Sequence, residues 1–231
     1  MTELLRVDTR ADLQAALKSL DSSVPKRSEG RRAEHTERFC IAHLLATLPH
    51  AYISFPLVVL HEDKPYFVLS MPSCSIGIEH TEAVAENVAR AQFLREKGHG
   101  PDAYFAPHAV PGEARKTMTE LLEEIERDEA GDGWVGDSGE LWSKAMAHYA
   151  ERKIAKAASF RRYEKNWLLI YDNWFLPGLR IGTAAVRLSV RLSRLSVFDV
   201  FDTVFVLSDA TLCEFSPDPF IHKIIDPKAA G

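Results

Sequence analysis

The sequence of 231 residues has only three cysteines, Cys40, Cys74 and Cys213, and no C-x-x-C pair. Widely spaced cysteines in odd number indicate neither a disulfide framework nor a zinc ribbon, so a reducing cytoplasm is the expected compartment. No apolar run approaches the roughly 20 residues of a membrane helix, and the N-terminal stretch mixes acids and bases without an apolar core. We therefore expect a cytoplasmic protein with no signal peptide and no membrane contact.

An excess of charge of one sign is also missing. The chain has 28 Lys and Arg against 33 Asp and Glu, a net charge of −5. A mildly acidic surface argues against a non-specific nucleic-acid coat protein, although it leaves room for a local basic groove. The hydrophobic content of 46% is enough for one sizeable core. We expect one domain over 1–231, with a core at about 30–216, an N-terminal helix and linker at 1–29, an insertion with loops and a helix at 99–136, and a tail at 217–231.

Familiar nucleotide and hydrolase motifs are absent: the sequence contains no G-x-x-x-x-G-K-[ST], no G-x-S-x-G and no H-E-x-x-H. What it does contain is a clear order of elements. Three strand-like runs within 51–82 are separated by short turns, which predicts an antiparallel meander. The apolar runs 166–172 and 203–208 follow helical segments and are typical of strands covered on both faces, so they should extend the same sheet. The predicted fold class is α/β, with a mixed central sheet flanked by helices.

One strand-like run ends in a cluster of polar residues. The segment "SIGIEHTEAV", 75–84, carries Glu79, His80, Thr81 and Glu82 in a row before an expected helix. Thr81 would cap that helix, and Glu82 would lie in its first turn, where the helix dipole stabilises an acid. His80 could act as a general base or pack on the opposite face of the strand.

The segment "KPYFVLSMPSCSIGIEHTEAV", 64–84, follows an acid-bearing helix and precedes the strand-like "NWLLIYDNW". In this arrangement the chain resembles the PD-(D/E)xK nuclease superfamily, which has the restriction-endonuclease-like fold. The resemblance implies a Pro-Asp pair on one strand and an acid-x-Lys triplet on the next, converging on one or two divalent cations. Pro65 and Glu79 match this pattern, whereas Tyr66 occupies the Asp position and Thr81 the Lys position.

The resemblance implies a magnesium or manganese site at Glu79, because hard cations prefer carboxylate oxygens. Further carboxylates are close to Glu79 in the sequence or lie on the preceding helix. These candidate ligands are Asp63, Glu82, Glu34 and Glu37. Each also has an ordinary structural interpretation, as a turn residue, a helix-dipole acid or a solvated side chain.

The missing positive charge has a candidate source on the helix predicted at 138–160. Its inward stripe of Trp142, Met146 and Tyr149 continues to Lys153 and Lys156. Lysines on an inward stripe must extend to solvent or meet an acid. Alternatively, one of them replaces the lysine that the strand lacks. The predicted catalytic set is Glu79, His80, Lys153 and Lys156.

The function implied is Mg-dependent phosphodiester hydrolysis by a nuclease with a degenerate active site. One alternative is a catalytically inactive interaction module on the same scaffold, with Trp134, Trp142, Trp167 and Trp174 near a partner surface. Another is a metal-dependent hydrolase of small molecules, with a pocket under segment 99–116. The partner would be nucleic acid or protein, and arginines recurring over 180–194 are either a phosphate groove or an ordinary solvated helix face. The sequence leaves the oligomeric state open.

Overall fold

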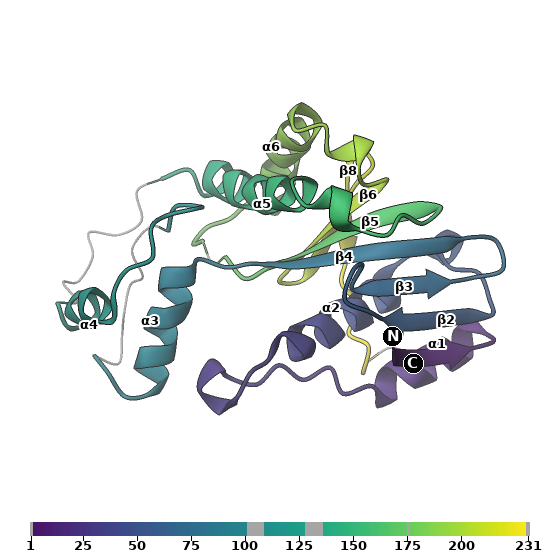
Figure 1. The fold of residues 1–231 in the computed structure, drawn as a ribbon, viewed down its shortest axis with the longest axis horizontal. Helices are drawn as coiled ribbons and strands as arrows, with labels where there is room; N and C mark the ends of the chain where they lie inside the picture. The colour runs from purple at the N-terminus through teal and green to yellow at the C-terminus, as the bar shows by residue number, and fades with distance from the viewer. Residues whose placement is uncertain (1, 101–108, 128–135, 175, 230–231) are drawn as a thin grey trace.

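The computed structural model describes residues 2–100, 109–127, 136–174 and 176–229. Its centre is one sheet of eight strands that lie side by side in sequence order (Figure 1). Neighbouring strands are antiparallel except for the two pairs at the centre, β4 with β5 and β5 with β6, which are parallel. The strands are β1 Thr2–Val7, β2 Leu57–His61, β3 Phe67–Ser70, β4 Ser75–Ala83, β5 Lys165–Asp172, β6 Thr203–Ser208, β7 Thr211–Phe215 and β8 Pro219–Lys223.

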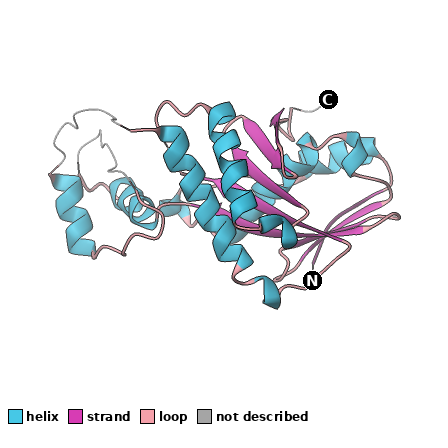
Figure 2. Cartoon of the chain, turned by 90° about the horizontal axis from the view of Figure 1, so that it is seen from above, coloured by secondary structure: helices cyan, strands magenta, loops and turns pink. Residues whose placement is uncertain are grey.

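Six α-helices accompany the sheet in the described part of the chain. α1 and α2 cover one face, α5 and α6 cover the other, and α3 with α4 lies beyond one end of the sheet (Figures 1 and 2). α5 and α6 make the crossovers that two parallel strand pairs require. The helices are α1 Arg10–Ser19, α2 Ala33–Thr47, α3 Glu86–Glu96, α4 Met118–Glu126, α5 Ser138–Ile154 and α6 Ile181–Arg194.

One hydrophobic core lies on each face of the sheet, between the sheet and its helices. Alternate side chains of each central strand contribute to the two cores. Trp167 and Leu169 of β5 pack towards α2, while Leu168 and Ile170 pack towards α5 and α6. This explains the nearly continuous apolar run of β5, since neither face meets water. A smaller cluster joins α3 to α4.

The α/β class and the mixed sheet flanked by helices are confirmed. β2, β3 and β4 form the expected antiparallel meander, and β5 and β6 extend the same sheet. The predicted helix in the 99–136 insertion is α4; residues 101–108 and 128–135 lie outside the described part.

The two edges of the sheet differ from the sequence prediction. The sequence predicts a helix and a linker over 1–29, but these residues also supply β1, which pairs with β2. The tail at 217–231 supplies β8, which pairs with β7. The core thus extends beyond 30–216 at both ends. β1 and β8 lack a strong apolar run because an edge strand has a solvated side. The hydrophobic periodicity of the sequence therefore gave little indication of either strand.

No helix among the described residues has both the length and the apolar character needed to cross a membrane.

Candidate functional site

β4 extends beyond the end of its neighbour β3. β3 pairs with β4 only as far as Ile78, while β5 pairs with β4 up to Ala83. Residues 79–83 therefore have a strand neighbour on one side only, at the edge where β3 stops. The polar cluster is part of the strand and not the entry to a helix, because α3 begins only at Glu86. The expected roles of Thr81 as a helix cap and of Glu82 as a first-turn acid are therefore wrong.

Glu79 meets Lys153 from the last turn of α5. The Nζ of Lys153 donates a hydrogen bond to Oε2 of Glu79 at 2.9 Å, and the side chains are 13% and 4% exposed. The inward stripe of α5 thus brings a lysine to the acid, 74 residues away in the sequence. Lys156 lies after the end of α5 and is exposed. The two lysines that were predicted on one inward stripe therefore have different environments.

The ion pair with Lys153 does not fully compensate for the burial of the Glu79 carboxyl group. Burial raises the pKa of Glu79, and the nearby Lys153 charge offsets only part of that rise. Its second oxygen, Oε1, is buried and has no hydrogen-bond partner among the described residues. The site is therefore a tight, poorly solvated acid–base pair.

Aromatic side chains enclose this pair. The Nζ of Lys153 lies 4.7 Å from the ring centroid of Tyr66 and 5.8 Å from that of Phe160. Cation–π contact stabilises an ammonium group where water is excluded. Tyr66, at the position where the nuclease pattern has its aspartate, thus lies against the lysine and contributes no carboxylate.

His80 is 5% exposed, and its ring makes an edge contact with Tyr66 at a centroid distance of 5.9 Å. Burial, with a smaller effect of the Lys153 charge, lowers the pKa of His80 to about 3. The imidazole is therefore neutral near pH 7, and so weak a base is poorly matched to proton abstraction at that pH. Its Nε2 atom has no partner in the described part of the chain.

Glu82 is engaged by a different set of residues. Its Oε1 atom accepts hydrogen bonds from Arg27 at 3.3 Å, Arg31 at 2.8 Å and Asn173 at 2.7 Å. These contacts attach the segment before α2 to the ends of β4 and β5. The structure therefore gives Glu82 a structural ion-pair network and does not place it with Glu79.

The three remaining candidate ligands occupy separate places. Oε2 of Glu37 contacts Nε2 of His61 at 2.9 Å, and Glu34 is exposed in the first turn of α2. Asp63 is exposed in the turn between β2 and β3, yet its charge contributes to the raised pKa of both Glu79 and Tyr66. Asp63 is thus the candidate whose charge acts on Glu79.

The donor set does not fit a resident divalent cation. Among the residues that the structure describes, no group of three or more His, Cys, Asp or Glu side chains is placed to hold a metal ion. The buried carboxylate already binds an ammonium group, and the Lys153 charge would repel a second cation at the same place. The chemistry of these side chains is therefore that of an ion pair.

Comparison of the chain with protein-family models, curated proteins and solved structures gave no match. Function has to be inferred from the geometry of the chain itself.

Sequence reasoning missed Tyr66 as a partner of Lys153, since only the fold brings the two together. The tryptophans are also placed differently from the prediction: Trp142, Trp167 and Trp174 are buried at 0%, 2% and 6% exposure, so they do not form a partner surface. Trp134 lies outside the described residues, as do residues 101–108 of the segment 99–116, under which a small-molecule pocket was predicted.

Proposed function

We propose that this chain is a restriction-endonuclease-like scaffold that acts as an interaction module and does not hydrolyse phosphodiesters. The scaffold is supported by the order α2, β2, β3, β4, α5, β5, in which an antiparallel meander is followed by a helical crossover to a parallel strand. It is further supported by Glu79 on the third strand of that meander, at the edge where β3 ends.

The observation that carries the non-catalytic assignment is the closed Glu79–Lys153 pair under Tyr66. Metal-assisted hydrolysis needs a cation with open positions for water and phosphate. Here the ammonium group lies against the carboxylate, and an aromatic ring lies against the ammonium group. Such an arrangement stabilises the fold where a catalytic site would need an accessible, charged cavity.

A protein partner fits the surface better than nucleic acid does. Arg187 of α6 forms an ion pair with Asp137, the N-cap residue of α5, and Arg191 forms one with Glu140 of α5. Arg31 forms an ion pair with Glu82. Arginines neutralised within the chain have little charge left for phosphates, whose binding depends on releasing counterions. Of the arginines over 180–194 for which the sequence left a phosphate groove open, Arg187 and Arg191 therefore link α6 to the start of α5, whereas Arg180 and Arg194 are exposed.

The outer edge of β8 is the surface that we assign to this partner. Phe220 and Ile221 on β8 are 61% and 38% exposed. The opposite edge, β1, is protected by a bulge between Glu3 and Leu5 and by charged side chains. An extended segment of a partner protein could add a strand to β8 and cover both apolar side chains. Backbone amides on the outer side of β8 should exchange rapidly with solvent in the isolated protein, and protected amides there would contradict an open edge.

A metal-dependent nuclease is the second candidate, and one observation favours it. Burial raises the pKa of Tyr66, and the charges of Glu37, Glu79 and Asp63 add to that rise, so three carboxylates act on one ring. A cation could use them only if Lys153 left Glu79.

Nuclease assays and calorimetry separate the two candidates. Wild type, Glu79→Gln and the exposed control Glu34→Gln are incubated with single- and double-stranded DNA and RNA in magnesium or manganese. Titration calorimetry with each metal accompanies the assay. We expect no cleavage and no metal binding by any of the three proteins. Cleavage by wild type and the control that falls by about 10²-fold or more in Glu79→Gln would refute the non-catalytic assignment.

A further inference from the structure

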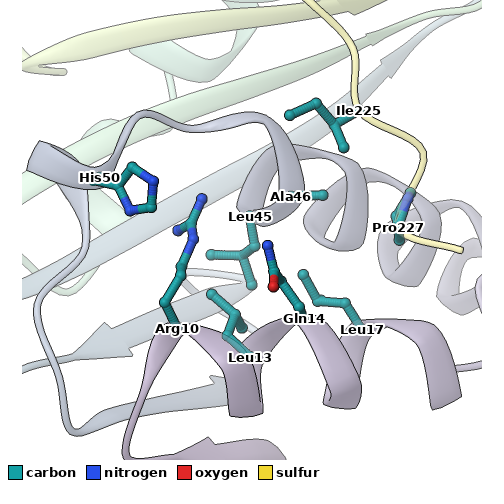
Figure 3. Close-up of a pocket in the computed structure, with 9 residues that line it drawn as sticks. All are labelled: Arg10, Leu13, Gln14, Leu17, Leu45, Ala46, His50, Ile225 and Pro227. Carbon is teal, nitrogen blue, oxygen red and sulfur yellow. The ribbon is translucent and has the colours of Figure 1, made fainter. Parts of the chain in front are cut away.

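A cavity of about 140 Å³ lies between α1, α2 and the C-terminal tail, on the face of the sheet opposite α5 (Figure 3). It belongs neither to the Glu79 site nor to the β8 edge. α1 and α2 form two of its sides, and the segment that follows β8 crosses the third. Its lining residues are Arg10, Leu13, Gln14, Leu17, Leu45, Ala46, His50, Ile225 and Pro227.

Among the residues that the structure describes, Arg10 has no anionic partner at this cavity. Its Nη2 donates to the carbonyl oxygen of Leu48 at 3.1 Å, whereas its Nη1 is buried and has no hydrogen-bond partner among the described residues. Burial lowers the pKa of Arg10, and no carboxylate of the described chain counteracts that effect. The nearby Arg6, by contrast, forms an ion pair with Glu3 at 2.7 Å.

An arginine in this position is costly unless an anion meets it. A partly desolvated charge is unfavourable without a counter-charge, and a guanidinium group presents donors that match a carboxylate. Since Arg10 lines the cavity, a guanidinium group without a carboxylate partner among the described residues is a feature of the cavity, not general surface basicity.

The rest of the lining defines what accompanies the anion. In Figure 3, Arg10 and His50 lie together at one end, and the amide of Gln14 lies beside them. The remaining walls are the apolar side chains of Leu45, Ile225 and their neighbours. The volume is close to that of an apolar cavity that accepts benzene, about 150 Å³. One ring or a short branched chain therefore fits.

We propose that this cavity is a binding site for a small molecule with a carboxylate group on an apolar body the size of a single ring. The carboxylate forms an ion pair with the guanidinium group of Arg10, and the apolar body packs among the leucines of α1 and α2. The tail closes the site: the amide of Ile225 donates to Oγ1 of Thr47 at 3.0 Å, and the amide of Ile224 donates to the carbonyl of Ala210 at 3.0 Å.

The test is a titration with benzoate, followed by calorimetry and by NMR shifts of the lining methyl groups. Wild type and Arg6→Gln, which changes an exposed arginine outside the cavity, should bind benzoate equally. Arg10→Gln should bind at least about tenfold more weakly, a loss of about 1.4 kcal/mol. Ala46→Leu keeps Arg10 and fills part of the cavity, so it should also weaken binding by at least about tenfold. This variant keeps the test decisive even if Arg10→Gln loses its contact with Leu48 and unfolds.

Two further probes examine the two halves of the ligand. Benzyl alcohol keeps the ring without the charge, and inorganic phosphate keeps a charge without the ring. Both should bind at least about tenfold more weakly than benzoate. Equal binding of benzyl alcohol would overturn the role of Arg10, and equal binding of phosphate would overturn the role of the apolar walls. No benzoate binding by wild type at millimolar concentration, or full binding by Ala46→Leu, would overturn the site.

Discussion

Among the residues that the structure describes, Lys153 is the only hydrogen-bond partner of the Glu79 side chain, and replacing it by methionine removes that partner while keeping most of the apolar stem. The Lys153 and Glu79 side chains are 13% and 4% exposed, and their charged atoms are 2.9 Å apart. Breaking a buried ion pair by removing one partner costs about 3–5 kcal/mol, because the other charge is left uncompensated. Since Glu79 can take up a proton, we expect a loss near the lower end, about 3 kcal/mol near neutral pH.

The pH dependence makes this prediction specific. Burial raises the pKa of Glu79 in the folded protein, and Lys153 opposes the rise, so its removal should raise that pKa further. The folded variant then keeps a proton that the unfolded chain releases at about pH 4.3. Its stability is retained at acid pH and is lost as the pH rises through the folded pKa. The stability difference from wild type should therefore grow with rising pH, in a range that starts above about pH 4.3.

Urea denaturation of both proteins across this pH range gives the measurement. Lys156→Met is the matched control, because Lys156 is exposed and should change stability by no more than about 0.5 kcal/mol. A Lys153→Met cost that equals that of the control, or that does not vary with pH, would refute a buried ion pair at this site.

Three further predictions concern single residues elsewhere in the sheet and its surroundings. Gly77→Ala would place its Cβ atom 2.7 Å from the ring of Tyr163, so thermal unfolding should show a loss of about 1–3 kcal/mol, and an unchanged Tm would contradict this close approach. NMR titration should find the His80 ring neutral down to about pH 4, whereas a midpoint near 6.5 would disagree with its burial. Tyr52→Phe removes the hydroxyl that donates to the buried Glu214, so denaturation should report a loss of about 1–3 kcal/mol; wild-type stability would show that the bond contributes nothing.

The sequence by itself determined the central elements. The apolar runs of β5 and β6 and the turns of the early meander are local patterns, so strands and their α/β arrangement followed from periodicity. The stripe on α5 likewise predicted that Lys153 points inward, since residues at helical spacing share one face. Glu79 stood out because it directly follows an apolar run.

Only the tertiary structure decided what these residues meet. Lys153 and Glu79 are 74 residues apart, and Arg31 and Glu82 are 51 apart, so no local pattern could pair them. The edge strands β1 and β8 depend on hydrogen bonds to partners rather than on apolar periodicity. Glu82 was expected in the first turn of a helix, yet pairing with β5 keeps the strand extended to Ala83. Long-range backbone pairing and the compensation of buried charges are properties of the folded chain. Because of them, the predicted acid cluster is divided between two separate sets of ion pairs, one at Glu79 and one at Glu82.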